Sequence, residues 1–175
     1  MQGRLLPKYY GRYQAHPVGY WKDEFPIASQ LGLDSIEFIL DYNDVEKNPL
    51  LTSGGIEDIQ KIEQLSRVKV RSICADYFME APIHSNNKAI VDKSLNVLDR
   101  LIKNASLLDV KNIVIPCVDQ SSLKNTENKN NFINNIKMMV GTAERADINL
   151  SLETDLAPIP FANLLDSINS KNVTV

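Results

Sequence analysis

The sequence predicts an α/β fold, specifically a (β/α)8 barrel that is truncated after about its sixth strand. Strand-like and helix-like segments alternate along all 175 residues, and this order is typical of a parallel sheet with right-handed crossovers. Carboxylates lie in or near the ends of four of the predicted strands. The chain is also shorter than the roughly 250 residues of a complete barrel. We therefore expect residues 1–175 to form a single incomplete barrel domain.

Six segments have the composition of strands that are buried on both faces, because they are short, apolar and rich in Ile and Val. The predicted strands cover residues 3–6, 35–40, 68–75, 112–117, 148–153 and 172–175. The last of these has no helix after it in the sequence, which is one reason to expect an unfinished barrel.

Helices are predicted between the strands from apolar residues at helical spacing. Three stripes show it: Ile56, Ile59, Ile62 and Leu65; Leu98, Leu101, Ile102 and Ala105; and Phe132, Ile136, Met139, Val140 and Ala143. A shorter helix over residues 22–31 should end at Gly32, which readily adopts a left-handed conformation. Pro160 suits the first turn of a last helix that ends near Asn169. Residues 120–131 are polar and are expected to form a long, mobile loop that runs into a helix.

An open, doubly wound sheet is the alternative architecture for six parallel strands. The acidic residues near the strand ends, Glu37, Asp76, Asp119 and Glu153, favour the barrel, because all strand ends of a barrel converge on one mouth. In an open sheet the site gathers at the point where the strand order reverses, and outlying strands need no such residues. The sequence also lacks the glycine-rich motifs with which open sheets bind nucleotides.

Composition argues against several classes of partner. The 19 basic and 22 acidic residues give a formal charge of −3, whereas broad contact with nucleic acid favours a basic face. No apolar run approaches the roughly 20 residues of a membrane span, and no secretion signal opens the sequence. Cys74 and Cys117 lie in apolar runs and are expected to be buried thiols of a cytoplasmic protein.

Four segments of the sequence, taken together and in this order, resemble the sugar phosphate isomerase/epimerase family of xylose-isomerase-like TIM barrels. They are Met-Gln-Gly-Arg-Leu at residues 1–5, Gly-Leu-Asp-Ser-Ile-Glu-Phe at 32–38, Ser-Ile-Cys-Ala-Asp-Tyr-Phe-Met at 72–79, and Leu-Ser-Leu-Glu-Thr at 150–154. The resemblance covers about the first five to six βα units. It implies an isomerase or epimerase that acts on a small sugar or sugar phosphate.

The same resemblance implies a divalent metal, Mn²⁺, Mg²⁺, Co²⁺ or Zn²⁺, at the barrel mouth. In the family its ligands are a Glu at the end of strand five and then an Asp, a His and a Glu from the next three strands. Only the first ligand falls within this sequence, on Glu153. We therefore expect residues 1–175 alone to bind the metal weakly.

Glu153 is also the candidate catalytic residue. Isomerisation and epimerisation of sugars require removal of a proton from the carbon next to a carbonyl, and a carboxylate can move that proton while a hard cation holds the enediolate oxygens. A Glu at a strand end suits both roles, because the strand fixes its position. The alternative is a carboxylate that caps a helix or forms a salt bridge.

Arg4, Glu37 and Asp76 are candidate substrate-binding residues. Glu37 interrupts a strand that should be buried, so it needs an ionic partner or must face the mouth. For Arg4 and Glu37, the alternative is an internal ion pair between the two. For Asp76, the alternative is a structural role in which it supports its loop. Asp119 is a weaker candidate. His16 and His84 lie in predicted loops and are more simply explained as surface residues than as catalysts.

An aromatic cluster precedes the first predicted helix and consists of Tyr9, Tyr10, Tyr13, Tyr20 and Trp21. Flat rings pack well on the C–H faces of sugars, so the cluster is a candidate lid or wall of a sugar site. It is equally a candidate for packing on the barrel rim or for a subunit interface.

Two other functions remain open beside the isomerase or epimerase. One is an abasic-site endonuclease on the same type of barrel, against which the acidic charge balance argues. The other is a catalytically inactive barrel fragment that serves as a binding or assembly module, because an unclosed barrel exposes two sheet edges and favours association, including homo-oligomers. Whether the substrate is phosphorylated also remains open.

Overall fold

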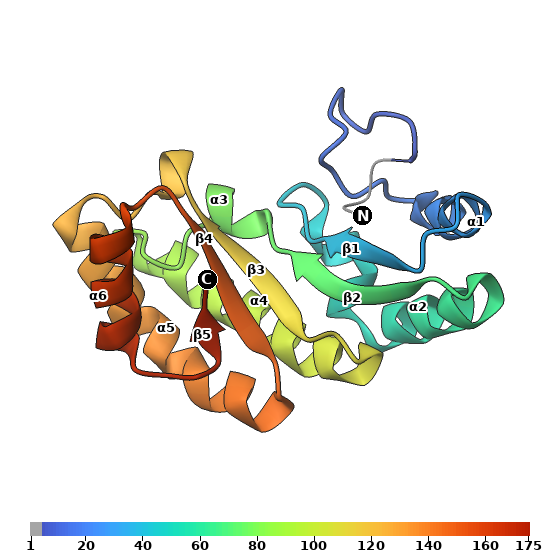
Figure 1. The fold of residues 1–175 in the computed structure, drawn as a ribbon. Helices are drawn as coiled ribbons and strands as arrows, with labels where there is room; N and C mark the ends of the chain where they lie inside the picture. Colours follow the sequence, from blue (N-terminus) through green and yellow to red (C-terminus); the bar gives the residue numbers. More distant parts are fainter. Residues whose placement is uncertain (1–4) are drawn as a thin grey trace.

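A computed structural model of the chain describes residues 5–175 and contains one parallel sheet of five strands (Figure 1). The strands are β1 (Ser35–Ile39), β2 (Lys69–Cys74), β3 (Asn112–Cys117), β4 (Asn149–Thr154) and β5 (Val173–Thr174). The helices are α1 (Glu24–Gln30), α2 (Ser53–Ser66), α3 (Tyr77–Glu80), α4 (Lys88–Ala105), α5 (Thr126–Ala146) and α6 (Pro158–Ile168). Short 3-10 helices cover Trp21–Asp23, Val45–Lys47, Pro49–Leu51, Ser106–Leu108 and Asp119–Ser121.

The strands follow one another across the sheet in the order β1-β2-β3-β4-β5, and every neighbouring pair is parallel. A doubly wound sheet reverses its strand order, so the barrel prediction is confirmed and the open-sheet alternative is wrong. Each described strand matches one of the predicted strands from the second to the sixth. The first prediction, residues 3–6, lies partly outside the described residues, and its described part, Leu5 and Leu6, forms a bend instead of a strand.

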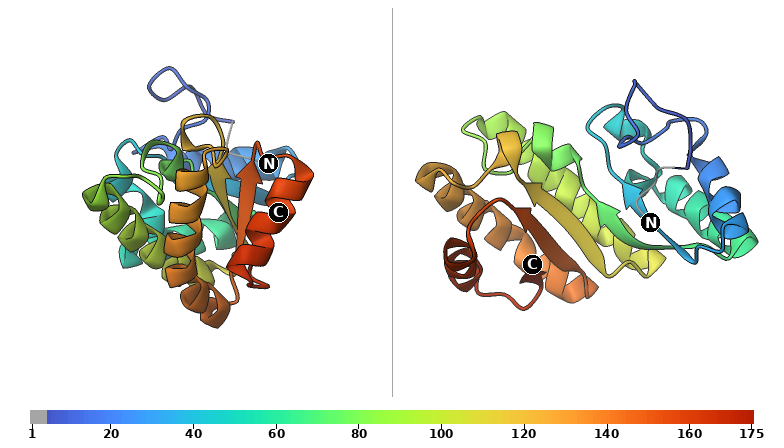
Figure 2. Two further views of the ribbon diagram at one scale, coloured as in Figure 1. Left: turned by 90° about the vertical axis from the view of Figure 1, so that its left-hand side faces the viewer. Right: turned by 45° about the horizontal axis from the view of Figure 1, so that its top comes forward.

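Helices α2, α4 and α5 pack along one face of the curved sheet, which we call the helix face (Figures 1 and 2). Side chains from alternate positions of the strands point into this layer, as the two-residue period of a strand requires. All of them are at most 5% exposed: Ile36, Phe38, Ile73, Ile113, Ile115, Leu150, Leu152 and Val173. This layer is the hydrophobic core of the chain.

The opposite face of the sheet, which we call the open face, is polar and partly exposed. Glu37, Ser72, Asn112 and Asn149 are aligned by strand register in a row across β1 to β4. Ser72 Oγ donates a hydrogen bond to Glu37 Oε2 at 2.9 Å. Asn149 Nδ2 donates to Asn112 Oδ1 at 3.0 Å and to Thr174 Oγ1 on β5 at 2.8 Å. These polar contacts form two groups on the open face. One joins β1 to β2, and the other joins β3, β4 and β5.

Local chemistry explains where most helices begin and end. Gly32 has a φ of +74° and follows α1, as predicted. Asn169, also left-handed with a φ of 56°, ends α6. Asn125 caps α5 by accepting hydrogen bonds from the backbone N–H groups of Glu127 and Asn128. Helix α5 therefore starts at Thr126, so the predicted long loop over residues 120–131 is wrong in its second half.

No helix within residues 5–175 is both long enough and apolar enough to cross a membrane.

Candidate functional site

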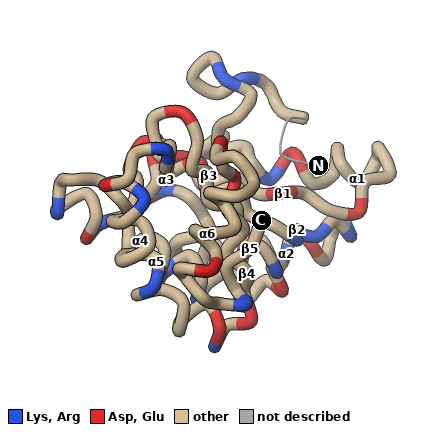
Figure 3. Tube along the Cα trace, turned by 60° about the vertical axis from the view of Figure 1, so that its left-hand side comes forward, with Lys and Arg blue, Asp and Glu red and all other residues tan. Residues whose placement is uncertain are grey.

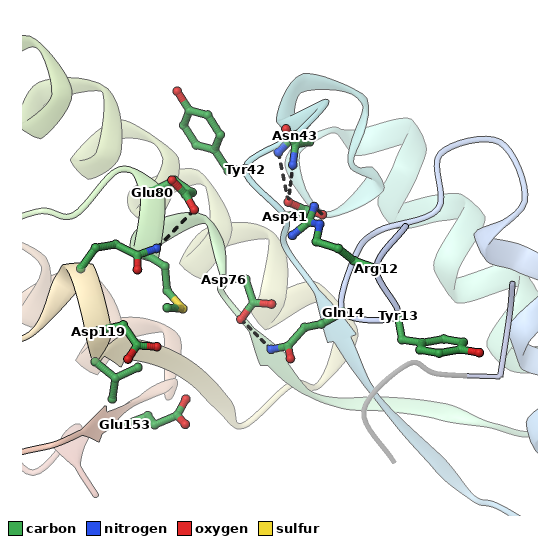
Figure 4. A pocket seen from close by; sticks show the side chains of 13 residues that line it. Arg12, Tyr13, Gln14, Asp41, Tyr42, Asn43, Asp76, Glu80, Asp119 and Glu153 are labelled. Carbon is green, nitrogen blue, oxygen red and sulfur yellow. Dashed lines mark hydrogen bonds and ion pairs between the residues drawn. The ribbon is translucent and has the colours of Figure 1, made fainter. Parts of the chain in front are cut away.

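A cleft of about 900 Å³ opens at the carboxyl ends of strands β1 to β4, and we call it the strand-end cleft (Figure 4). Most of its lining residues are polar, and they come from the N-terminal segment, from the segments that follow β1, β2 and β3, and from β4 itself. The lining residues are Arg12, Tyr13, Gln14, Asp41, Tyr42, Asn43, Asp76, Met79, Glu80, Val118, Asp119, Gln120 and Glu153. Substrate sites of parallel barrels lie at this end of the strands.

Four of the five carboxylates that line the cleft lie at or just past the end of a strand. Asp41, Asp76 and Asp119 each stand two positions after the last residue of β1, β2 and β3. Glu153 is the fifth of the six residues of β4 and is exposed. Because parallel strands end at the same edge of the sheet, this placement gathers acidic groups from segments far apart in the sequence.

The N-terminal segment closes one side of the cleft through hydrogen bonds to the strand ends. Arg12 Nη2 donates to Asp41 Oδ2 at 2.8 Å, and Gln14 Nε2 donates to Asp76 Oδ1 at 3.1 Å. The hydroxyls of Tyr9 and Tyr10 both donate to Asp44 Oδ2 at 3.2 Å. These contacts fasten the segment to the loops after β1 and β2.

Asp41 is the buried anchor of this arrangement. Its residue is 3% exposed, and besides Arg12 it accepts hydrogen bonds at Oδ1 from the backbone N–H of Asn43 at 3.1 Å and from Asn43 Nδ2 at 3.3 Å. A buried carboxylate needs such charge and hydrogen-bond partners to stay ionised. The pair of Arg12 and Asp41 is therefore a structural element of the cleft wall.

Glu153 differs from Asp41 because its carboxylate makes no hydrogen bond or ion pair with any other described residue.

Cys117 is buried, and burial together with the negative charges of Asp155 and Glu153 raises the pKa of the Cys117 thiol. That thiol is thus protonated and is no nucleophile. Both cysteines are buried and free, as predicted.

The remaining predicted site residues fall in different places. Asp76 lines the cleft and also accepts a hydrogen bond from Cys74 Sγ at 3.1 Å. Asp119 lines it too. Glu37 lies in the middle of β1, not at its end, and borders a small hollow beside His16. Arg4 lies outside the described residues. The geometry thus brings Asp76, Asp119 and Glu153 together and leaves Glu37 below them on the open face.

The expectation that the two histidines lie on the surface is wrong. His16 is 2% exposed and packs against Phe38, with ring centroids 5.4 Å apart, while His84 is 3% exposed and packs against Phe132. Burial lowers the pKa of each to about 4, although Asp41 partly opposes this at His16. Both rings are therefore neutral at pH 7. Their loops fold back onto the core, which no local pattern in the sequence reveals.

The aromatic cluster divides between the core and the cleft. Trp21 is 9% exposed and packs edge-on against Phe25 and Phe38, so it belongs to the core. Tyr13 lines the cleft and is 56% exposed. Tyr10 is 67% exposed. The cluster therefore combines a packing role at Trp21 with a wall of the cleft at Tyr13.

Sequence reasoning missed several cleft residues: Arg12, Gln14, Asp41, Tyr42, Asn43 and Glu80. Asp41 could have been selected for the same reason as Asp76, because it directly follows a predicted strand. Arg12 and Gln14 had no such signal, since their contacts span 29 and 62 positions of sequence.

The described residues do not form a metal site. Within residues 5–175, no group of three or more His, Cys, Asp or Glu side chains is arranged to hold a metal ion. Glu153 alone offers one carboxylate, whereas protein sites for divalent cations use several ligands. Its role as a metal ligand stays a prediction.

Charges of both signs are interspersed along the chain, and the view in Figure 3 shows no broad basic face. Eleven ion pairs join Lys or Arg to Asp or Glu in the described part of the chain, most of them at the surface. This distribution does not favour binding to a nucleic-acid backbone.

Known structures resemble this chain in fold. It matches a 3-keto-D-glucoside 4-epimerase from E. coli with a TM-score of 0.67 and 14% identity, over 87% of this chain and 60% of that one. A D-psicose 3-epimerase from Clostridium cellulolyticum H10, solved with D-tagatose, gives a TM-score of 0.71 and 15% identity, over 91% and 58%. A xylose isomerase-like TIM barrel protein from Mycobacterium smegmatis, solved with magnesium, gives a TM-score of 0.67 and 16% identity, over 91% of this chain and 56% of that one.

The sequence itself matches no protein-family model and no curated protein. Identities of 14–16% to the three solved structures show the fold and leave the activity open. The chain spans somewhat more than half the length of each of these proteins. It therefore has the fold of the xylose-isomerase-like TIM barrels, in the form of a partial barrel whose described sheet has five parallel strands.

Proposed function

We propose that this chain forms part of the active site of an isomerase or epimerase of small sugars, and that the strand-end cleft receives the sugar. The observation that carries the proposal is the convergence of Asp41, Asp76, Asp119 and Glu153 on one cleft of about 900 Å³. Carboxylates and amides are the groups with which proteins bind sugar hydroxyls, because they accept and donate hydrogen bonds in fixed directions. The fold shared with sugar epimerases supports the same assignment.

Glu153 is the proposed base. Its exposed carboxylate is not engaged by another described side chain, so it is available to take the proton from the carbon next to the sugar carbonyl. The electron pair of that C–H bond then forms the carbon–carbon double bond of an enediolate, and the carbonyl oxygen takes up the negative charge. Protonation of the same carbon from the opposite face gives the epimer. Protonation of the neighbouring carbon, with transfer of the hydroxyl proton from one oxygen of the enediolate to the other, gives the isomer.

Asp76 and Gln14 are proposed to hold sugar hydroxyls, with Tyr13 and Tyr42 as walls of the cleft. Glu37 and Arg4 remain candidates for substrate binding. No step is assigned to a metal ion, because the described residues do not make a site for one. No observation favours the abasic-site endonuclease, and the acidic lining would repel a phosphate backbone.

Hydrogen exchange at the sugar tests the proposal. The 175-residue chain would be incubated in D₂O with D-fructose, D-psicose or D-tagatose, and loss of the proton next to the carbonyl would be followed by NMR. We expect exchange with at least one ketose and a rate about a hundredfold or more lower in Glu153→Gln. Glu57→Gln, an exposed carboxylate change on α2, is the matched control and should leave the rate unchanged.

Equal rates in Glu153→Gln and the unaltered chain would remove Glu153 from the role of base. No exchange and no binding with any of the three ketoses would contradict the proposed function as a whole.

A further inference from the structure

A carboxylate outside the strand-end cleft holds the segment that forms one wall of it. Residues 9–14, which we call the wall segment, contribute Arg12, Tyr13 and Gln14 to the lining of the cleft. Asp44 lies in the loop after β1 and is not among the described lining residues. Its side chain nevertheless accepts hydrogen bonds from the wall segment. Asp44 can therefore affect the cleft through the segment that it holds.

The tip of the wall segment is a tight turn that keeps its own shape. The backbone N–H of Tyr9 donates to the carbonyl oxygen of Arg12 at 2.9 Å, and the N–H of Arg12 donates to the carbonyl oxygen of Tyr9 at 3.0 Å. Tyr10 and Gly11 lie between them and have positive φ angles of 48° and 74°. A two-residue hairpin turn of type I′ requires this pair of conformations. Because the tip is one closed turn, contacts that fix its tyrosines also fix the residues that follow.

Both oxygens of the Asp44 carboxylate are engaged, each by a different part of the molecule. Oδ2 accepts hydrogen bonds from the hydroxyls of Tyr9 and Tyr10, both at 3.2 Å, and Oδ1 accepts one from Lys47 Nζ at 2.8 Å. The hydrogen bond from Lys47, joined by those from Tyr10 and Tyr9, lowers the pKa of Asp44, so the carboxylate is ionised at neutral pH. The backbone N–H of Lys47 also donates to the carbonyl oxygen of Asp44 at 2.7 Å. Asp44 is thus a fixed anion that faces two tyrosine donors.

The wall segment depends on such an anchor because most of it is exposed. Residues 10–14 are exposed, whereas Ala15 and His16 are only 4% and 2% exposed. The segment is therefore secured at one end by burial and at the other by hydrogen bonds from the tyrosine side chains. Gln14 lies between these two ends and donates to Asp76 in the cleft at 3.1 Å. The position of Gln14 thus depends on whether the tip is held.

We infer that Asp44 is a positioning residue of the strand-end cleft, which holds the tip of the wall segment and thereby places Gln14 for a bound sugar. The inference rests on the proposed function, because the sugar is the ligand that Gln14 meets, and it assigns a role to a residue outside the cleft. A wall that is ordered in advance binds more tightly, since no ordering has to accompany binding. Both hydroxyl bonds are longer than the about 2.5–2.7 Å of the strongest hydroxyl–carboxylate bonds, so a moderate effect is expected.

Removal of the two hydroxyls tests the inference and leaves both rings in place. In Tyr9→Phe/Tyr10→Phe we expect lower ¹⁵N order parameters at the amides of residues 10–14. Titration with D-fructose, D-psicose and D-tagatose should show about threefold to tenfold weaker binding of the ketose that binds the unaltered chain. The rate of exchange in D₂O at saturating ketose should change by less than about twofold, because Glu153 is unchanged.

Tyr20→Phe is the matched control. The ring of Tyr20 packs near that of Tyr9, with centroids 6.1 Å apart, but its hydroxyl makes no hydrogen bond with another described residue. This variant should leave the order parameters and the affinity unchanged.

Asp44→Asn weakens the same contacts from the other side. Asn tolerates the left-handed backbone of residue 44, where φ is 54°, and ketose binding should weaken in the same direction. Added to Tyr9→Phe/Tyr10→Phe, it should have little further effect on affinity, because the contacts that it weakens are already absent. In a Gln14→Ala chain, the two tyrosine changes should cost clearly less affinity, because the side chain that they place is missing.

The outcomes separate the inference from the proposed function. Unchanged order parameters and unchanged affinity in the tyrosine variant would overturn the inference and leave a sugar site standing. An equal loss of affinity with and without the Gln14 side chain would also overturn it. Binding of no ketose to the unaltered chain would overturn the proposed function. Order parameters in the tyrosine variant would then still decide whether Asp44 holds the wall segment, with lower values supporting it and unchanged values contradicting it.

Discussion

The helix face and the open face of the sheet are built from neighbouring residues of the same strands, yet the two faces differ in chemical character. Leu150 is fully buried against the helices, while Ser151, the next residue of β4, exchanges hydrogen bonds with Asn112 and Asn149 on the open face. In a complete barrel the open face is the interior, which is usually filled with branched apolar residues. Here a polar row crosses it and leads up to the acidic strand-end cleft. The helix face is thus packed as the hydrophobic core, whereas the open face is polar and leads to the candidate site.

The largest expected difference between the two faces is in stability. Leu150→Ala should lower the free energy of unfolding by about 2–5 kcal/mol, because it removes buried methyl groups and leaves a cavity. Ser151→Ala should lower it by about 1 kcal/mol or less, since it removes only partly exposed hydrogen bonds. Urea unfolding followed by circular dichroism measures both. Similar losses in the two variants would contradict the division of roles between the faces.

For each residue concerned, a somewhat smaller effect on stability is expected from acid. In the unfolded chain His16 and His84 should titrate near pH 6.5, whereas in the folded chain burial lowers the pKa of both to about 4. The unfolded state therefore binds more protons between these values. The free energy of unfolding should be constant above about pH 7 and fall as the pH drops towards 4, by up to about 3 kcal/mol for each histidine.

Urea unfolding at a series of pH values checks this, with the double variant His16→Gln/His84→Gln as the comparison. Its stability curve should be flatter between about pH 7 and about pH 4.5. Asp44 and Asp155, whose pKa values are lowered first of all by hydrogen bonds from Lys47 and Lys124, contribute only at more acidic pH. A curve as steep as that of the unaltered chain would show that the histidines are not the cause.

The smallest effects are expected where α2 meets the preceding turn. A Cβ added at Gly55 would lie 2.3–2.7 Å from three backbone atoms of Pro49, while one added at Gly54 would have no atom within 4 Å. Gly55→Ala should therefore cost about 1–3 kcal/mol of stability. Gly54→Ala should add about 0.5–1 kcal/mol, because alanine favours the helix. Thermal unfolding measures the stability of both variants. Equal effects on stability would show that the backbone at Pro49 shifts to make room for the added methyl group.

The sequence predicts the five strands well, because each contains a local run of Ile, Val or Leu that becomes buried against the helices. It predicts Asp76, Asp119 and Glu153 at the cleft for a similar reason, since strand ends converge in any parallel barrel. It does not predict Arg12, Gln14 or the buried state of His16. These depend on how the N-terminal segment folds back across the strand ends, which is decided by tertiary contacts.

The central claim is that the acidic end of the open face is a sugar site while the helix face is structural. Backbone amide shifts in a ¹⁵N-labelled chain titrated with D-fructose, D-psicose and D-tagatose test it most directly. The account predicts shifts confined to the cleft lining, above all at Gln14, Asp76, Asp119 and Glu153, and none along α2, α4 and α5. Shifts centred on the helices, or no shift with any of the three ketoses, would contradict it.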